Sequence, residues 1–128
     1  MPELVSFDYA IVRVVPRVDR EEFINVGIIL FCRAQRFLVA RVKLDAARLA
    51  ALAPHLDASL VQKQIDLLPK ICAGGADAGA LGKLSQTERF LWLISPRSTT
   101  IQVSPAHAGL CEDPKAELDR LFKEMVES

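Results

Sequence analysis

The run at residues 26–32, Val-Gly-Ile-Ile-Leu-Phe-Cys, most limits what this chain can fold into. It carries no charged or amide side chain, so an extended strand here presents apolar groups on both faces. Such a strand is stable at the centre of a sheet, where other elements cover both faces. The sequence therefore predicts a central strand with packed elements on each side.

Two neighbouring segments have strand patterns. Residues 7–16 are rich in β-branched and aromatic side chains and end at Pro16, which cannot donate a backbone hydrogen bond. Residues 36–44 alternate between the two faces, and residues 33–35 have the length of a hairpin connection. These patterns predict a three-stranded antiparallel meander. Residues 99–103 are predicted to add a later strand, which gives an antiparallel sheet of about four strands.

Helix signals follow the meander. Asp45 is expected to cap a helix that runs through Ala53, and Asp57 a second helix that Pro69 kinks or ends near Leu68. Residues 73–82 contain four of the six glycines and are expected to form a mobile loop.

The last third of the chain has two more helix starts. Ser85 and Glu88 have capping-box spacing, and residues 90–94 are expected to lead from a helical turn into an extended segment. Asp113 and Pro114 are expected to start a C-terminal amphipathic helix. Its core-facing stripe comprises Leu118, Leu121, Phe122, Met125 and Val126. Together the patterns predict an α+β fold, with residues 1–128 as a single domain.

Charge and composition limit the classes of partner. The 16 Lys and Arg residues balance the 16 Asp and Glu residues, so no global basic field favours nucleic acid. No apolar run approaches the roughly 20 residues needed to span a membrane. The first residues lack the pattern of a secretory signal, and we expect a cytoplasmic protein.

Metal and cofactor signatures are missing from the sequence. Cys32, Cys72 and Cys111 are too widely spaced to suggest a zinc site and are odd in number, which argues against a disulfide framework. No glycine-rich dinucleotide fingerprint, phosphate-binding loop, His-Glu-x-x-His or Gly-x-Ser-x-Gly motif occurs. We therefore expect neither a cofactor nor a metal.

The first candidate cluster lies around the turn between the first two strands and has two interpretations. As a binding site, Arg13 would hold a carboxylate or phosphate and Glu22 would be a general base or metal ligand. Alternatively, its members are ion-paired turn residues. The cluster comprises Arg13, Arg17, Asp19, Arg20, Glu21, Glu22 and Asn25.

A second cluster combines guanidinium and hydroxyl groups, which is the chemistry that holds an anion. It comprises Arg89, Ser95, Arg97, Ser98, Thr99, Thr100, Gln102, Ser104 and His107. Ordinary turn and strand structure is the alternative explanation. His107 precedes Cys111 in a predicted loop, so His107 as a base and Cys111 as a nucleophile is a further interpretation. Adjacency in the sequence does not set the geometry that such a pair requires.

Several of these residues carry a resemblance to a known family. The chain resembles the bacterial domain-of-unknown-function family numbered 3037, and the resemblance covers nearly the whole chain. The matching segments are residues 9–13, Pro16, residues 22–32, 88–90, 96–98, 104–105, 107–109 and 113–114. No established activity comes with the resemblance, but it implies a kinase-like protein partner of the HipA type.

Three hypotheses for function remain. In the first, the protein is a small binding or accessory module that holds a protein partner or anionic ligand at one end of the sheet. The residues expected to converge there are Arg13, Glu22, Asn25, Arg97, Ser98 and His107. In the second, it is an enzyme that acts on a phosphorylated or nucleotide-like substrate, with Glu22 or His107 as base. In the third, it is a structural subunit that forms a homo-oligomer through apolar surface that includes Trp92.

Overall fold

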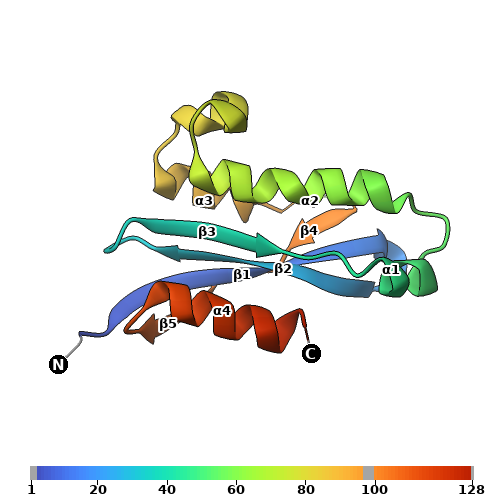
Figure 1. The fold of residues 1–128 in the computed structure, drawn as a ribbon, viewed down its shortest axis with the longest axis horizontal. Coiled ribbons are helices and arrows are strands. Elements are labelled where there is room, and N and C mark those ends of the chain that lie inside the picture. Colours follow the sequence, from blue (N-terminus) through green and yellow to red (C-terminus); the bar gives the residue numbers. More distant parts are fainter. Residues whose placement is uncertain (1–2, 97–99, 128) are drawn as a thin grey trace.

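The computed structural model describes residues 3–96 and 100–127 and has an antiparallel sheet with helices on both faces (Figure 1). The described residues form a five-stranded sheet. Its strands are β1 (Val5–Arg17), β2 (Glu22–Cys32), β3 (Phe37–Val42), β4 (Ile101–Val103) and β5 (His107–Cys111). The strand order is β3-β2-β1-β4, and β5 also pairs with β1.

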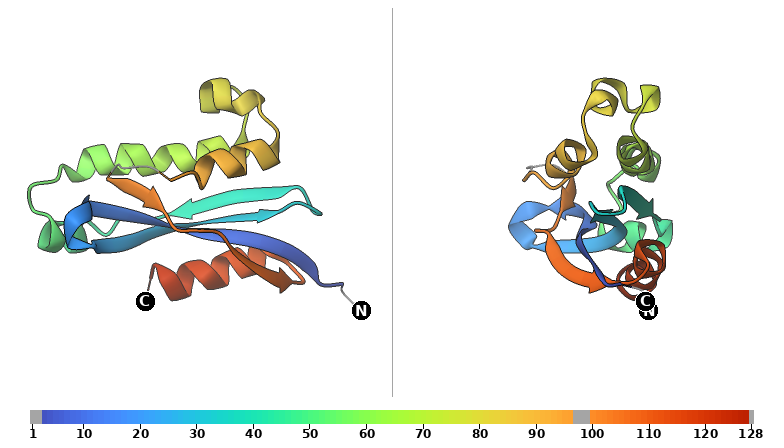
Figure 2. Two further views of the ribbon diagram at one scale, coloured as in Figure 1. Left: turned by 180° about the vertical axis from the view of Figure 1, so that it is seen from behind. Right: turned by 90° about the vertical axis from the view of Figure 1, so that its left-hand side faces the viewer.

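The long strand β1 organises one edge of the sheet. Its Val12–Val14 portion pairs with β4, and its Val5–Tyr9 portion pairs with β5. Between these two portions, Ser104 takes over the hydrogen bonding of the β1 backbone. The N–H of Ile11 donates to Ser104 Oγ at 2.8 Å, and the N–H of Ser104 donates to Ile11 O at 2.9 Å. β4 and β5 thus follow one another along the same edge, as the orange ribbon in Figure 2 shows.

The predicted meander of β1, β2 and β3 is confirmed, and so is the later strand, observed as β4. Thr99, the first residue of that predicted strand, lies outside the described residues. The loop expected around His107 is wrong, because this segment is β5. Alanine and glycine give it little intrinsic strand preference, so its pairing with β1 decides its conformation.

The helices begin at the predicted caps. Asp45 accepts two backbone N–H hydrogen bonds from the next turn, and Asp57 and Asp113 accept one each. Ser85 and Glu88 form a reciprocal capping box. The α-helices are α1 (Ala46–Leu52), α2 (Ala58–Ala73), α3 (Gln86–Leu93) and α4 (Pro114–Met125). Two 3₁₀ segments, η1 (Val18–Arg20) and η2 (Ala76–Lys83), complete the described elements.

The structure corrects three expectations about the helical region. α2 does not end near Leu68 but continues past Pro69, because Ile71 and Cys72 are buried in the core beyond it. The predicted glycine-rich loop contains η2, where Gly75 N donates to Gly82 O at 3.3 Å. A Cβ on Gly82 would lie 1.9 Å from that Gly75 oxygen, so the glycine permits this close backbone approach. Likewise α3 continues through Leu93 instead of turning extended near Phe90.

Each face of the sheet has its own apolar core. This confirms the prediction of a central strand with packed elements on both sides. On one face, Val12, Ile29 and Phe31 pack with residues of α1, α2 and α3. On the other, Ile28 and Leu30 pack with Leu118 and Phe122 of α4. The end-on view in Figure 2 shows α2 and α3 on one side of the sheet and α4 on the other. No helix in residues 3–96 or 100–127 combines the length and apolar character of a membrane span.

Candidate binding site

Arg13 occupies the middle of a row of polar side chains that crosses three strands. It pairs with Asn25 of β2 on one side and with Gln102 of β4 on the other. Directly paired residues of antiparallel strands present their side chains on the same face. Val26 is the extra residue of a β-bulge, because the register passes from Val12–Gly27 to Arg13–Asn25. The bulge therefore brings Asn25 beside Arg13, on the face that carries α4.

The Arg13 guanidinium lies over the ring of Phe23, with its Cζ 4.4 Å from the ring centroid. This cation–π contact orients the planar group. Arg13 forms no ion pair within the described part of the chain, and its buried Nε has no hydrogen-bond partner there. Phe23 itself is 46% exposed. The contact thus holds a cation in place without neutralising it.

A shallow hollow of about 500 Å³ surrounds this pair, and we call it the Arg13 hollow. Val15 and Val103 form apolar parts of its wall. Gln102, Ser104 and Pro105 line the hollow from the β4 side. Glu21, at the turn before β2, also lines the hollow and has a positive φ of 55°. Its carboxylate forms no ion pair with Arg13. The hollow therefore combines one fixed guanidinium, an aromatic wall and one acidic side chain.

Asn25 contacts the C-terminal end of α4. Its Nδ2 donates to the backbone oxygen of Met125 at 3.0 Å, which ties β2 to the end of α4. Its Oδ1 is buried without a hydrogen-bond partner among the described residues. Asn25 also lines a separate small cavity of about 100 Å³ together with Lys43, Asp45 and Arg48. The amide thus helps to position the sheet beside Arg13.

Glu22 lies in a different hollow. It forms an ion pair with Arg20, whose Nη2 is 2.5 Å from Glu22 Oε1, and it is paired with Arg17 in the ladder. With His55 it lines a hollow of about 240 Å³ near the end of α1. Since Phe23 faces Arg13 and successive strand residues point to opposite faces, Glu22 points away from the Arg13 hollow.

His107 is also distant from Arg13. It pairs with Tyr9, and the two ring centroids are 5.2 Å apart. Arg13 is four residues further along β1, or about 13 Å at the usual strand rise. Proton transfer requires contact at about 3 Å, so neither Glu22 nor His107 is placed as a base for a group held at Arg13.

The base and nucleophile pair considered for His107 and Cys111 is also not formed. Both lie on β5, four residues apart, which is about 13 Å along an extended strand. Burial raises the pKa of the Cys111 thiol, which disfavours the thiolate. The strand geometry therefore provides no contact between base and nucleophile.

Arg97 and Ser98, the centre of the second predicted cluster, lie outside the described residues. Arg89, also assigned to that cluster, is buried next to the end of α2 instead. Its Nη1 donates to Leu84 O at 2.5 Å and its Nη2 to Cys72 O at 3.4 Å. This guanidinium joins α2, η2 and α3 and is unavailable to a ligand beside Gln102.

The structure thus brings Arg13 and Asn25 together and separates them from Glu22 and His107. Sequence reasoning did not identify Phe23 as a member of the site. The signal that could have found it is the two-residue strand period, which places Phe23 and Asn25 on one face of β2. Assigning that face to Arg13 still required the bulge at Val26.

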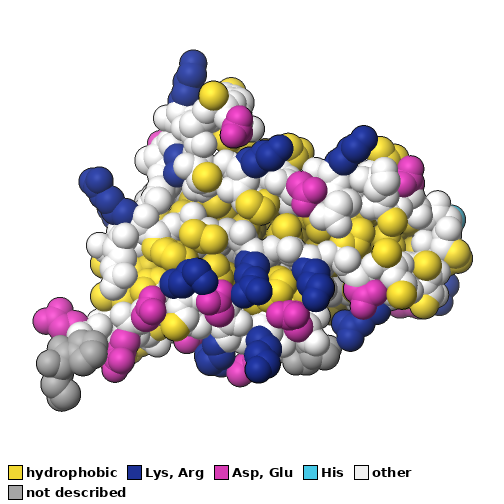
Figure 3. All heavy atoms as spheres, in the orientation of Figure 1, with side chains coloured by type: hydrophobic (Ala, Val, Ile, Leu, Met, Phe, Trp, Pro, Cys, Tyr) yellow, Lys and Arg dark blue, Asp and Glu magenta, His cyan; other side chains and the backbone are white. Residues whose placement is uncertain are grey.

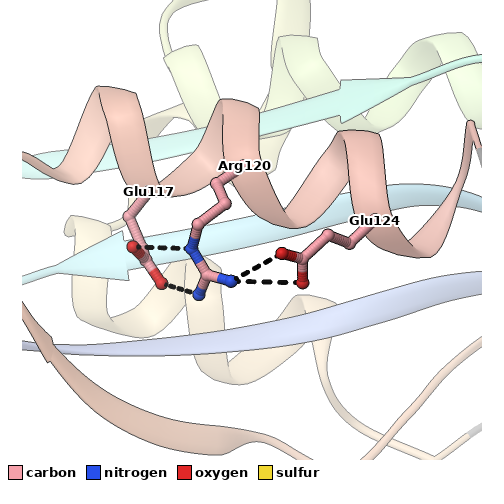
Figure 4. Close-up of polar contacts among 3 residues, drawn as sticks. All are labelled: Glu117, Arg120 and Glu124. Carbon is pink, nitrogen blue, oxygen red and sulfur yellow. Dashed lines mark hydrogen bonds and ion pairs between the residues drawn. The ribbon is translucent and has the colours of Figure 1, made fainter.

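Several charged side chains around α4 form ion pairs. Figure 3 shows basic and acidic side chains interspersed along the lower part of this view, where α4 lies. There Arg41 pairs with Asp119 and Lys43 with Glu127. On α4, Arg120 is held between Glu117 and Glu124 (Figure 4). The unpaired guanidinium of Arg13 therefore contrasts with the basic side chains of these ion pairs.

Comparison with known proteins found one family. The family model described as "Protein of unknown function (DUF3037)" matches residues 9–126. No curated protein and no solved structure matched the chain.

Proposed function

Because the chain belongs to the DUF3037 family of proteins of unknown function, we propose a function from the site itself. The protein is a small cytoplasmic binding module that holds an anionic group, a carboxylate or a phosphate, at Arg13. A protein partner, kinase-like as the resemblance implies, is the proposed bearer of that group.

The observation that carries the proposal is that the Arg13 guanidinium is held in place but forms no ion pair within the described residues. It is oriented by Phe23 and opens on the Arg13 hollow. A planar fork of donors suits the two oxygens of a carboxylate or phosphate, and a pre-oriented group loses less entropy on binding. Gln102 is the ladder neighbour of Arg13 on the β4 side.

Binding is favoured over the enzymatic alternative by the positions of the predicted bases. Glu22 opens on another hollow, and His107 is about 13 Å along β1 from Arg13. Glu21 lies at the hollow, but on a turn where it is exposed to solvent.

The test is an NMR titration of the protein with inorganic phosphate and, separately, with N-acetylglycine as a carboxylate. We expect amide shifts around Arg13, Phe23 and Gln102, and affinity at least about tenfold weaker in Arg13→Gln, since a charge-assisted hydrogen bond contributes about 1.5–3 kcal/mol. Arg33→Gln, on the exposed hairpin, is the matched control and should bind like the natural protein. The stronger of the two titrants identifies the class of anion.

Two results would overturn the proposal. One is the absence of shifts at the Arg13 hollow with either anion. The other is equal binding by the natural protein and Arg13→Gln. A large loss of thermal stability in Arg13→Gln with unchanged binding would show that the guanidinium serves the fold instead.

A further inference from the structure

The outer edge of β5 is a strand edge that carries no blocking side chain of its own. The strand order leaves two edges, one formed by β3 and the other by β4 and β5. The β3 edge carries Arg41, with Lys43 just beyond it, and both are held by ion pairs to or beyond α4. β5 contains neither lysine, arginine nor proline, the residues that usually block edge pairing. Among the described residues, only β1 pairs with β5.

Apolar side chains accompany this edge. Leu110 is 64% exposed and pairs with Ser6, so it lies on the face away from α4. Ala108 points to the same face two residues earlier, and it is also exposed. Leu4, immediately before β1, is 59% exposed. An added strand could cover Leu110 and Ala108 while it pairs with the backbone of β5.

The surroundings of β5 are acidic. Asp8 is the ladder partner of Ala108, and Glu112 and Asp113 directly follow the strand. Glu3 precedes the portion of β1 that pairs with the end of β5. None of these four carboxylates forms an ion pair within residues 3–96 and 100–127. Their charge is complementary to lysine or arginine on an incoming segment.

We propose that the β5 edge binds an extended segment of a partner protein in which apolar residues alternate with or are flanked by lysine or arginine. Backbone hydrogen bonds to β5 supply affinity, and Leu110 and Ala108 receive alternate apolar side chains. The four carboxylates of Glu3, Asp8, Glu112 and Asp113, which we call the acidic rim, select the basic side chains. This site is separate from the Arg13 hollow and does not rest on the function proposed for it.

A second copy of this chain fits the edge less well. Two β5 strands related by a twofold axis at Gly109 would form a ladder of only five residues each. Stable dimers usually bury about 1,200–2,000 Å² in total, more than such short strands offer. The pairing would also bring two acidic rims to one interface without basic partners.

The test is selection of a display library of random linear peptides on the full chain. We expect the selected peptides to be enriched in alternating apolar residues with lysine or arginine. Leu110→Lys should weaken their binding at least about tenfold, because it places a cation where a basic segment docks and blocks the edge as lysine does in natural sheets. Leu60→Lys is the matched control, since Leu60 is 57% exposed but lies on α2.

Backbone pairing has its own readout. Amide NMR should show the largest shifts in β5, and a selected peptide with N-methylated backbone amides should bind at least about tenfold more weakly at the same charge. Arg13→Gln should leave peptide binding unchanged, which separates this proposal from the function proposed above.

Five results would overturn the inference, four of them from the peptide experiments. They are failure to enrich any sequence, selection of acidic peptides, equal binding by Leu110→Lys and Leu60→Lys, and full binding by the N-methylated peptide. A dimer in sedimentation that Leu110→Lys dissociates would assign the edge to a second copy and would also overturn it.

Discussion

The side-chain amide of Asn25 donates to the backbone oxygen of Met125 at 3.0 Å, joining two residues that are 100 positions apart in the chain. This contact connects the start of the central strand to the end of α4. It also fixes β2 next to Arg13, its neighbour in the adjacent strand. The order of the Arg13 hollow therefore depends on the C-terminal helix.

We expect Asn25→Ala to lower the free energy of unfolding by about 1–2 kcal/mol, because the Met125 oxygen loses its side-chain donor. Urea unfolding measures the change, and Gln35→Ala on the exposed hairpin is the control. If Asn25→Ala is as stable as the control, the bond does not support the fold.

Gly27 is a site where any side chain would collide with β3. A Cβ there would lie 2.8 Å from Val42 Cγ1 and 2.9 Å from the backbone oxygen of Arg41. We expect Gly27→Ala to cost about 1–3 kcal/mol, as overpacking usually does. Adding Val42→Ala should recover part of the loss, because it removes the side-chain clash and leaves the backbone one. Thermal denaturation of both variants and of Val42→Ala alone measures this, and an undiminished Tm in Gly27→Ala would refute it.

Arg89 should hold the end of α2 and η2 together. Its guanidinium donates to the carbonyls of Leu84 and Cys72 and packs against Gly74, which has a φ of 76°. We expect Arg89→Met to cost about 1–3 kcal/mol, since it leaves buried acceptors without these donors. Hydrogen exchange should accelerate in residues 74–84 first. Arg33→Met is the control, and uniform acceleration over the sheet would contradict this local role.

The stability of the protein should fall at alkaline pH through Cys72. Burial raises the pKa of this thiol from 9.0 to about 12, with a smaller opposing effect of the Arg89 charge. Between these values the unfolded chain has lost the proton that the folded chain still binds. Its contribution to stability is therefore fully present below pH 9 and is lost as pH rises toward 12, by up to about 1.4 kcal/mol per pH unit.

Urea unfolding on either side of pH 9 measures this loss. Cys72→Ala is the matched variant, and its stability should depend less on pH over this range than that of the natural protein. Identical pH dependence in the two proteins would exclude Cys72 as the titrating group.

The sequence by itself determined the elements whose cause is local. Apolar character on both faces identified the central strand, and alternation identified its hairpin partner. The caps at Asp45, Asp57, Ser85 and Asp113 were correct, because a cap is a hydrogen bond between residues two or three positions apart.

Only the tertiary structure decided β5, the continuation of α2 past Pro69 and the composition of the site. β5 depends on pairing with a strand about 100 residues earlier, and α2 on burial of Ile71 and Cys72. The site depends on one extra residue at Val26, because a shift of one position changes the face on which every later side chain lies. That bulge places Asn25 and Phe23 with Arg13 and directs Glu22 to the opposite face, a long-range result that the polar pattern of the chain does not contain.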